Sequence, residues 1–156
     1  MNVKNQKMNV FVATSNVGKL NEFKTLLRDC PIDLLSKPNV FDIEETGATF
    51  KENASLKAIS VSRQVDSFVL ADDSGLIVDY LNGAPGIFSS RYAKNDRDRV
   101  QKILNKLGSS TNRSARFVSA LCIAYKSKVL IEVEGICEGQ ITYSPRGNSG
   151  FGYDPI

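Results

Sequence analysis

The sequence contains no histidine among its 156 residues. This absence removes the commonest general base of enzymes and the usual nitrogen ligand of zinc. Any acid–base or metal chemistry must therefore use carboxylates, which favour hard, oxygen-preferring ions such as magnesium.

Cysteines are few, and their spacing fits neither a disulfide framework nor a zinc site. Cys30, Cys122 and Cys137 are odd in number and form no CxxC pair. We interpret them as free thiols of a reducing compartment, which predicts a cytoplasmic protein. The polar segment Met1–Lys7 and the lack of a long apolar run predict neither a signal peptide nor a membrane-spanning helix.

Charge is also nearly balanced, with 20 basic and 17 acidic side chains and a net charge of +3. Proteins that bind nucleic acid usually carry a dense basic stripe, and the sequence has none. We therefore expect neither nucleic acid nor a membrane as a partner. A nucleic-acid-binding module is the alternative that a steep salt dependence of DNA binding would support.

Length and a hydrophobic fraction of 42% predict one domain with a sizeable core. Short apolar runs bounded by turn residues predict strands at 9–14, 32–35, 68–71 and 76–78. Helical periodicity predicts helices at 19–28, 49–64 and 95–107. Alternation predicts a half-exposed antiparallel hairpin over 115–125 and 129–143, with its turn at Ser127-Lys128. Together these patterns predict an α/β fold with a mixed sheet and flanking helices.

Capping residues define two of the helices. Thr49 and Glu52 fit a capping box, followed by an apolar stripe. Asn95 can cap the next helix, and Gly108 ends it. The stripes expected to be buried are Phe50, Ala54, Ala58 and Val61 in one helix, and Val100, Ile103, Leu104 and Leu107 in the other.

The first candidate site is the turn Thr14-Ser15-Asn16-Val17-Gly18-Lys19, between the first predicted strand and helix. Backbone amides at a helix N-terminus attract anions, and hydroxyls, an amide and a lysine surround them here. These residues suit a triphosphate, although the Walker A spacing is absent. An ordinary turn with a helix cap also fits them.

Two acidic pairs are candidates for metal or water chemistry. Asp72-Asp73 follows an apolar strand, so that one carboxylate can hold a metal while the other activates water. Glu44-Glu45 precedes a predicted helix. A tight turn over Asp72–Gly75 also explains the first pair, and compensation of the helix dipole explains the second.

The glycine-rich loop 147–155 is the fourth candidate. Its glycines let backbone approach a ligand closely, and Phe151 or Tyr153 can stack on a base. A flexible loop without a ligand is the alternative. In combination, the four candidates predict a magnesium-dependent nucleotide enzyme.

Six segments, in order along the chain, resemble the inosine triphosphate pyrophosphatase family, also called the Ham1-like family. They are TSNVGKLNE (14–22), EETGATFKENASLKA (44–58), ADDSGLIV (71–78), NGAPGIFSSR (82–91), ARF (115–117) and GFGYDPI (150–156). The resemblance implies a single elongated domain over 1–156, with two lobes, a central cleft and a homodimeric assembly. It implies hydrolysis of ITP, dITP and XTP to the monophosphate and pyrophosphate, which cleanses the nucleotide pool.

The resemblance also assigns roles to individual residues. Asp73, beside Asp72, would position or deprotonate the attacking water, while Lys19 and Lys57 neutralise charge on the phosphates. Magnesium would be held by Glu45, Glu44 and Asp73. Contacts with the nucleotide, including stacking of Phe151 on the base, would come from Thr14, Ser15, Asn16, Val17, Gly18, Lys19, Ser74, Phe151, Gly152, Tyr153 and Asp154.

Family members continue beyond the FGYDPI segment with a further strand, a lysine and a Ser-His-Arg element that reads the purine. The resemblance therefore implies that this sequence lacks the family's base-reading segment at its C-terminus. A catalytically impaired, nucleotide-binding remnant is one alternative function. A Maf-like pyrophosphatase is another, and the EETG and GFGYDP segments favour the inosine type over it.

Overall fold

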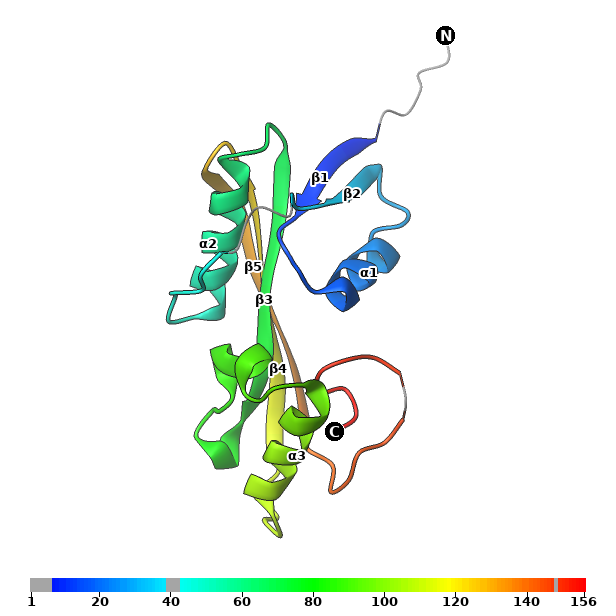
Figure 1. The fold of residues 1–156 in the computed structure, drawn as a ribbon, viewed down its shortest axis with the longest axis vertical. Helices are drawn as coiled ribbons and strands as arrows, with labels where there is room; N and C mark the ends of the chain where they lie inside the picture. Colours follow the sequence, from blue (N-terminus) through cyan, green and yellow to red (C-terminus); the bar gives the residue numbers. More distant parts are fainter. Residues whose placement is uncertain (1–6, 39–42, 148) are drawn as a thin grey trace. The chain divides into compact units, whose positions relative to one another are not determined.

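The computed structural model describes residues 7–38, 43–147 and 149–156, so most of Met1–Lys7, as well as Asp42 and Asn148, lies outside it. Its strands are β1 (Met8–Val12), β2 (Ile32–Ser36), β3 (Phe68–Val78), β4 (Ser114–Tyr125) and β5 (Lys128–Gln140). Its helices are α1 (Val17–Leu26), α2 (Phe50–Ser62) and α3 (Asp96–Leu107), with short 3₁₀ helices η1 (Asp79–Leu81) and η2 (Gly86–Arg91). The predicted α/β fold with a mixed sheet and flanking helices is confirmed (Figure 1).

The sheet has the strand order β2-β1-β3-β4-β5. β1 is parallel to both of its neighbours, with Val10 opposite Leu34 in β2 and Phe68 in β3. A two-residue turn joins β4 and β5, which makes that pair antiparallel. The turn consists of Lys126 and Ser127, at φ values of 47° and 65°, one residue earlier than predicted. Two successive positive φ values match the twist of a hairpin.

β3 corrects the sequence prediction at Asp72–Gly75. The segment was expected to form a turn between two strands, but β3 runs without interruption from Phe68 to Val78. Apolar residues on both sides of the polar segment, such as Leu70 and Leu76, are buried. Burial at both ends keeps the backbone extended, so tertiary packing outweighs the turn preference of Asp, Ser and Gly.

The chain divides into two compact units. The first unit comprises Met1–Asp72 and Ala120–Val133, and the second comprises Asp73–Ser119 and Glu134–Ile156. This division agrees with the two lobes that the resemblance implies. The cleft stays a prediction.

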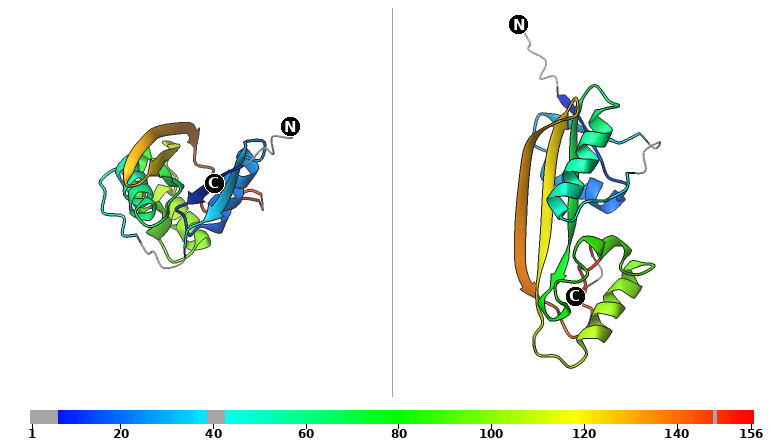
Figure 2. Two further views of the ribbon diagram at one scale, coloured as in Figure 1. Left: turned by 90° about the horizontal axis from the view of Figure 1, so that it is seen from above. Right: turned by 90° about the vertical axis from the view of Figure 1, so that its left-hand side faces the viewer.

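In the first unit, α2 lies beside β3, β4 and β5 (Figure 2). Its predicted apolar stripe is buried in full, and Thr49 caps it by accepting from the backbone N–H of Glu52 at 3.1 Å. The carboxylate of Glu52 accepts from the N–H of Ala48 at 2.6 Å, one residue before the N-cap. The buried face of β4 consists of the small residues Val118, Ala120, Cys122 and Ala124, of which the last three lie in this unit.

In the second unit, α3 packs on the ends of β3 and β4. The residues of this core cluster are Leu76, Val78, Val100, Ile103, Leu107, Ala115, Ile141 and Tyr153. Leu104 packs at its margin, so the predicted apolar face of α3 is confirmed. Asn95 caps the helix and Gly108 follows its last residue, also as predicted.

β5 differs from its neighbours because all of its residues are exposed. The predicted half-exposed hairpin therefore buries side chains on β4 alone, and β5 forms one edge of the sheet. None of the helices in the described ranges has the length and apolarity that crossing a bilayer requires.

Candidate active site

The turn between β1 and α1 leads into an exposed helix N-terminus. The side-chain oxygen of Asn16 caps α1 by accepting from the N–H of Lys19 at 3.2 Å, and the Asn16 N–H donates to the Thr14 hydroxyl at 3.1 Å. Ser15 and Val17 are exposed, and the first turn of α1, which is fully described, carries no acidic residue. An anion can therefore approach this helix N-terminus without repulsion from the helix's own side chains.

Lys19 links the turn to β3. Its Nζ lies 2.5 Å from Oδ2 of Asp72. The side chain of Asp72 is 4% exposed and that of Lys19 is 20% exposed. The Lys19 ammonium offsets the cost of burying this carboxylate away from water. Asp72 therefore holds the Lys19 ammonium beside the turn.

A second lysine–carboxylate pair lies between the acidic segment and α2. Nζ of Lys57 donates to Oε1 of Glu45 at 2.8 Å, and the two side chains are 13% and 18% exposed. Glu44, the preceding residue, is exposed. The structure thus distinguishes two acids that the sequence could not: Glu45 is held against α2, and Glu44 faces solvent.

Asn53 supports this acidic segment, and sequence reasoning missed it. Its side chain is fully buried in α2, and Oδ1 accepts from the N–H of Gly47 at 2.8 Å. A Cβ at position 47 would lie 2.7 Å from that oxygen, so glycine is required for this close approach. The available signal was a polar residue next to Ala54, inside the apolar stripe of a predicted helix.

Asp73 follows Asp72 in the middle of β3 and is also buried. Successive side chains of a strand point to opposite faces, so the two carboxylates have different surroundings. Ser74, the next residue, is half-buried. Two buried acids on opposite faces of one strand can take different roles.

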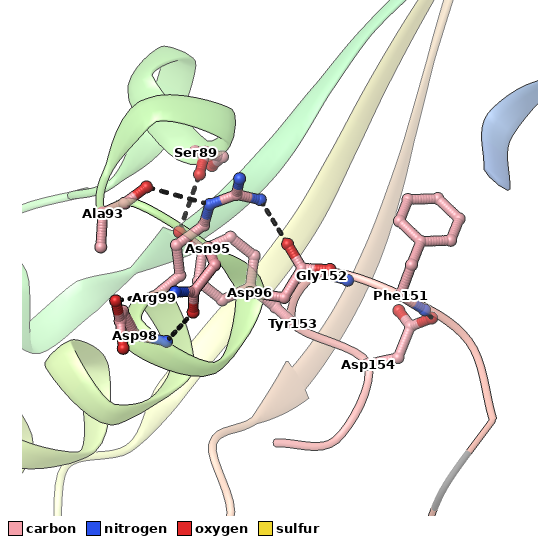
Figure 3. Close-up of polar contacts among 10 residues, drawn as sticks. All are labelled: Ser89, Ala93, Asn95, Asp96, Asp98, Arg99, Phe151, Gly152, Tyr153 and Asp154. Carbon is pink, nitrogen blue, oxygen red and sulfur yellow. Dashed lines mark hydrogen bonds and ion pairs between the residues drawn. The ribbon is translucent and has the colours of Figure 1, made fainter. Parts of the chain in front are cut away.

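The loop around Phe151, in the second unit, is held in place by side chains (Figure 3). The N–H of Phe151 donates to Oδ2 of Asp154 at 2.9 Å, and the N–H of Gly152 donates to Oδ2 of Asp96 at 2.8 Å. The phenyl ring of Phe151 points away from these contacts (Figure 3). The loop backbone is thus held at two points, and its role in binding a base stays a prediction.

Tyr153 occupies a different environment from Phe151. Its ring is buried in the core cluster of the second unit, and its hydroxyl donates to the carbonyl oxygen of Ser89 at 2.9 Å. Burial raises the pKa of Tyr153 to about 12, although the nearby Arg99 opposes the shift. The tyrosine therefore anchors the loop, and of the two aromatic candidates only Phe151 has a partly accessible ring.

Two further residues of the second unit were missed by sequence reasoning. Asp96 binds the N–H of Gly152, as described above. The guanidinium of Arg113 is buried and donates to the carbonyl oxygens of Ile141 and Thr142, at 2.8 and 2.9 Å, just before the loop. Asp96 looked like an ordinary acid in the first turn of a helix, and the position of Arg113 between a helix and a strand gave no signal.

Of the predicted site residues, the structure joins Lys19 to Asp72 and Lys57 to Glu45. The turn and both pairs belong to the first unit, whereas Asp73, Ser74 and the loop belong to the second.

Carboxylate oxygens are the side-chain ligands that magnesium prefers. Within the residues that the structure describes, no group of three or more acidic or cysteine side chains forms a ready-made metal cage. Magnesium does not need one, because it is usually held by one or two carboxylates together with water and substrate phosphates. Glu45 in the first unit and Asp73 in the second carry oxygen donors of the kind that magnesium prefers.

Known proteins are similar to this chain in sequence and in fold. A protein from Prochlorococcus marinus strain NATL1A named dITP/XTP pyrophosphatase is 59% identical over 145 residues, which cover 93% of this chain and 74% of that protein. A protein of the same name from a Nostoc species is 47% identical over 148 residues, covering 94% and 76%. A HAM1 protein structure from Coxiella burnetii is 43% identical with a TM-score of 0.84, over 96% of this chain and 80% of that one.

The model of the Ham1 family matches residues 10–156, nearly the whole sequence. This range contains the anion-accessible turn, both lysine–carboxylate pairs and the anchored loop. The shortened C-terminus that the resemblance implies stays a prediction. The match and the relatives agree with the segments from which the resemblance was inferred, and the chain belongs to the Ham1 family.

Proposed function

We infer that this chain is a nucleoside-triphosphate pyrophosphatase, which hydrolyses dITP, ITP and XTP to the monophosphate and pyrophosphate. Its relatives are named dITP/XTP pyrophosphatases. The structural observation that carries the inference is the Lys19–Asp72 ion pair. It holds the Lys19 ammonium beside an exposed helix N-terminus. The impaired nucleotide-binding remnant is not favoured, because the relatives carry the name of an active pyrophosphatase.

The phosphates of the substrate would bind at the turn of residues 14–19. Backbone amides at the start of α1 and the hydroxyls of Thr14 and Ser15 would donate to phosphate oxygens. Lys19 would share its charge between Asp72 and the phosphates, and Lys57 would do the same from Glu45. The two lysines would thereby share with magnesium the neutralisation of charge on the leaving pyrophosphate.

Magnesium would be held by Glu45 and Asp73, with the exposed Glu44 as a further oxygen donor. Bound there, the ion would supply positive charge for the phosphates and Lewis acidity for the reaction. The chain's own lysines would bind and orient the same phosphates.

Asp73, with Asp72 beside it, would position the attacking water and accept its proton. The water oxygen forms a bond to the α-phosphorus, and the bond from that phosphorus to the bridging oxygen breaks. Pyrophosphate then leaves with the electron pair of that bond. In this proposal Asp72 positions the water and Asp73 takes the proton, as general-base catalysis by a carboxylate requires.

The nucleoside end of the substrate would contact Ser74 and the loop residues Phe151, Gly152, Tyr153 and Asp154. Phe151 would stack on the base, because its ring is partly accessible and points away from the anchoring contacts. The buried Tyr153 would contribute by holding the loop in place.

The assembly, compartment and domain organisation are also proposals. We propose a single Ham1-like domain, a homodimer and a cytoplasmic location, with neither nucleic acid nor a membrane as partner. The nearly balanced charge supports the absence of a nucleic-acid partner, and the lack of a cysteine framework supports the cytoplasmic location, whereas the homodimer rests on the family resemblance. Light scattering of the purified chain tests the homodimer.

The products formed from dITP test the proposed activity. We expect dIMP and pyrophosphate in the presence of Mg²⁺, and loss of turnover when EDTA is added. Asp73→Asn should abolish the release of pyrophosphate while the circular dichroism spectrum stays unchanged. Release of orthophosphate in place of pyrophosphate, or full activity of the variant, would contradict the assignment.

A further inference from the structure

Phe151 lies between two glycines with left-handed backbone conformation, Gly150 at φ +85° and Gly152 at φ +63°. Glycine leaves the backbone free to adopt many conformations, so the direction of the phenyl ring has to be fixed by other contacts. The contacts on each side of Phe151 therefore decide how the ring is presented.

Each peptide group that flanks the Cα atom of Phe151 donates to a carboxylate. The group before it donates through the N–H of Phe151 to Asp154, and the group after it donates through the N–H of Gly152 to Asp96. Fixing both peptide planes fixes φ and ψ of Phe151, and with them the direction in which its side chain leaves the backbone. Asp154 belongs to the loop itself, whereas Asp96 comes from 56 residues earlier in the chain.

Asp96 is well suited to hold the loop from outside. It is the first residue of α3, and its second carboxylate oxygen, Oδ1, accepts from Arg99 at 2.7 Å. Arg99 in turn donates to the carbonyl oxygen of Ala93 at 3.5 Å (Figure 3). The carboxylate is therefore oriented by a fixed arginine on one side and holds the loop amide on the other.

We propose that Asp96 is a positioning residue for base binding, which fixes the ring of Phe151 through the N–H of Gly152. This role rests on the proposed function, because it matters for catalysis only if Phe151 stacks on the base. Asp96 then governs the KM for the nucleotide and leaves kcat unchanged, since it does not touch the reacting phosphates.

Asp98 offers a matched control on the same helix. It is also an exposed acid in the first turn of α3, but its hydrogen bonds are with Asn95, the N-cap. Asp98→Ala removes the same charge from the same helix end without removing a contact to the loop. Any effect of the helix dipole or of overall charge should therefore appear in both variants.

The test compares Asp96→Ala, Asp96→Asn and Asp98→Ala by kinetics with dITP and by hydrogen exchange of the Gly152 amide. Asp96→Ala should raise the KM about tenfold, the usual scale for losing a hydrogen bond to a charged group, and should speed exchange at Gly152. Asp96→Asn should keep the KM and the Gly152 exchange rate closer to those of the unsubstituted chain than Asp96→Ala does, because its amide oxygen can still accept from the Gly152 N–H. Asp98→Ala should match the unsubstituted chain.

Three results would overturn the proposal. Unchanged exchange at Gly152 in Asp96→Ala would show that the contact does not hold the loop, whether or not the chain is active. Faster exchange with an unchanged KM would show that loop position does not affect base binding. Equal losses in Asp96→Ala and Asp96→Asn would assign the effect to charge. An inactive unsubstituted chain would contradict the proposed function instead, and the exchange result would still decide the anchoring.

Discussion

The turn between β1 and α1 and the loop around Phe151 are both built from glycine and small polar residues, but they use their backbone amides differently. In the turn, the residues at the start of α1 are exposed, and the charged partner nearby is a lysine held by Asp72. In the loop, the amides on each side of Phe151 are already bound to carboxylates. The first arrangement gives an anion an exposed helix N-terminus beside a cation, and the second fixes the backbone that carries the ring of Phe151.

This difference matches the two ends of a nucleotide. A triphosphate needs donors and cations that can change partners, whereas a base needs a flat surface held in one orientation. The comparison predicts that substitutions in the turn lower kcat and that substitutions in the loop raise KM.

Lys19→Ala should have the largest effect of these substitutions, because it removes the cation proposed to bind the phosphates. Loss of a cation that stabilises developing charge should lower kcat on dITP about 100-fold or more, with a smaller change in KM. The variant should also lose about 1–3 kcal/mol of stability, because buried Asp72 loses a charged partner. Steady-state kinetics and urea unfolding measure both effects.

Lys24→Ala is the matched control for Lys19→Ala. Lys24 is an exposed lysine in the last turn of the same helix. It should keep wild-type kcat, and a loss as large as that of Lys19→Ala would show that overall charge, and not the pair with Asp72, determines the rate.

Phe151→Ala should have an intermediate effect, confined to binding. Stacking on a base is worth roughly 1–3 kcal/mol, which corresponds to a KM about 5- to 150-fold higher. Phe151→Leu separates stacking from simple apolar contact, because it keeps bulk without an aromatic face. A kcat that falls while KM stays constant in both variants would contradict the division between the two regions.

Tyr153→Phe should have the smallest effect, which appears in the pH dependence of the free energy of unfolding. The folded-state pKa of about 12 lies above the ordinary value of 10, so the unfolded chain loses the phenolic proton first as pH rises. Stability is therefore complete below about pH 10 and falls between pH 10 and 12. Unfolding of the phenylalanine variant should depend less on pH in this window, and an unchanged slope would contradict the burial argument.

Sequence patterns were sufficient where local and tertiary preferences agree. α2 and α3 combine a capping residue with a regular apolar stripe, and both were predicted with their buried faces. β3 was not, because Asp72–Gly75 favours a turn locally while its buried flanks and strand pairing favour an extended chain. The buried face of β4 is similarly hidden, since it consists of small residues opposite the larger Phe117 and Ile123.

The candidate site was predictable by residue but not by contact. Lys19, Asp72, Glu45 and Lys57 were all selected from the sequence, yet nothing in it shows which lysine pairs with which acid. Such pairings join residues far apart in the chain and depend on the tertiary fold. The contact of Asp96 with Gly152 was missed for the same reason.

The central claim is tested most directly by comparing kcat/KM for dITP and dGTP with the same preparation in Mg²⁺. We expect pyrophosphate release from both nucleotides to be measurable only with metal. We also expect kcat/KM to be about tenfold or more higher for dITP. Equal values for the two nucleotides, or a preference for dGTP, would contradict a dITP/XTP pyrophosphatase.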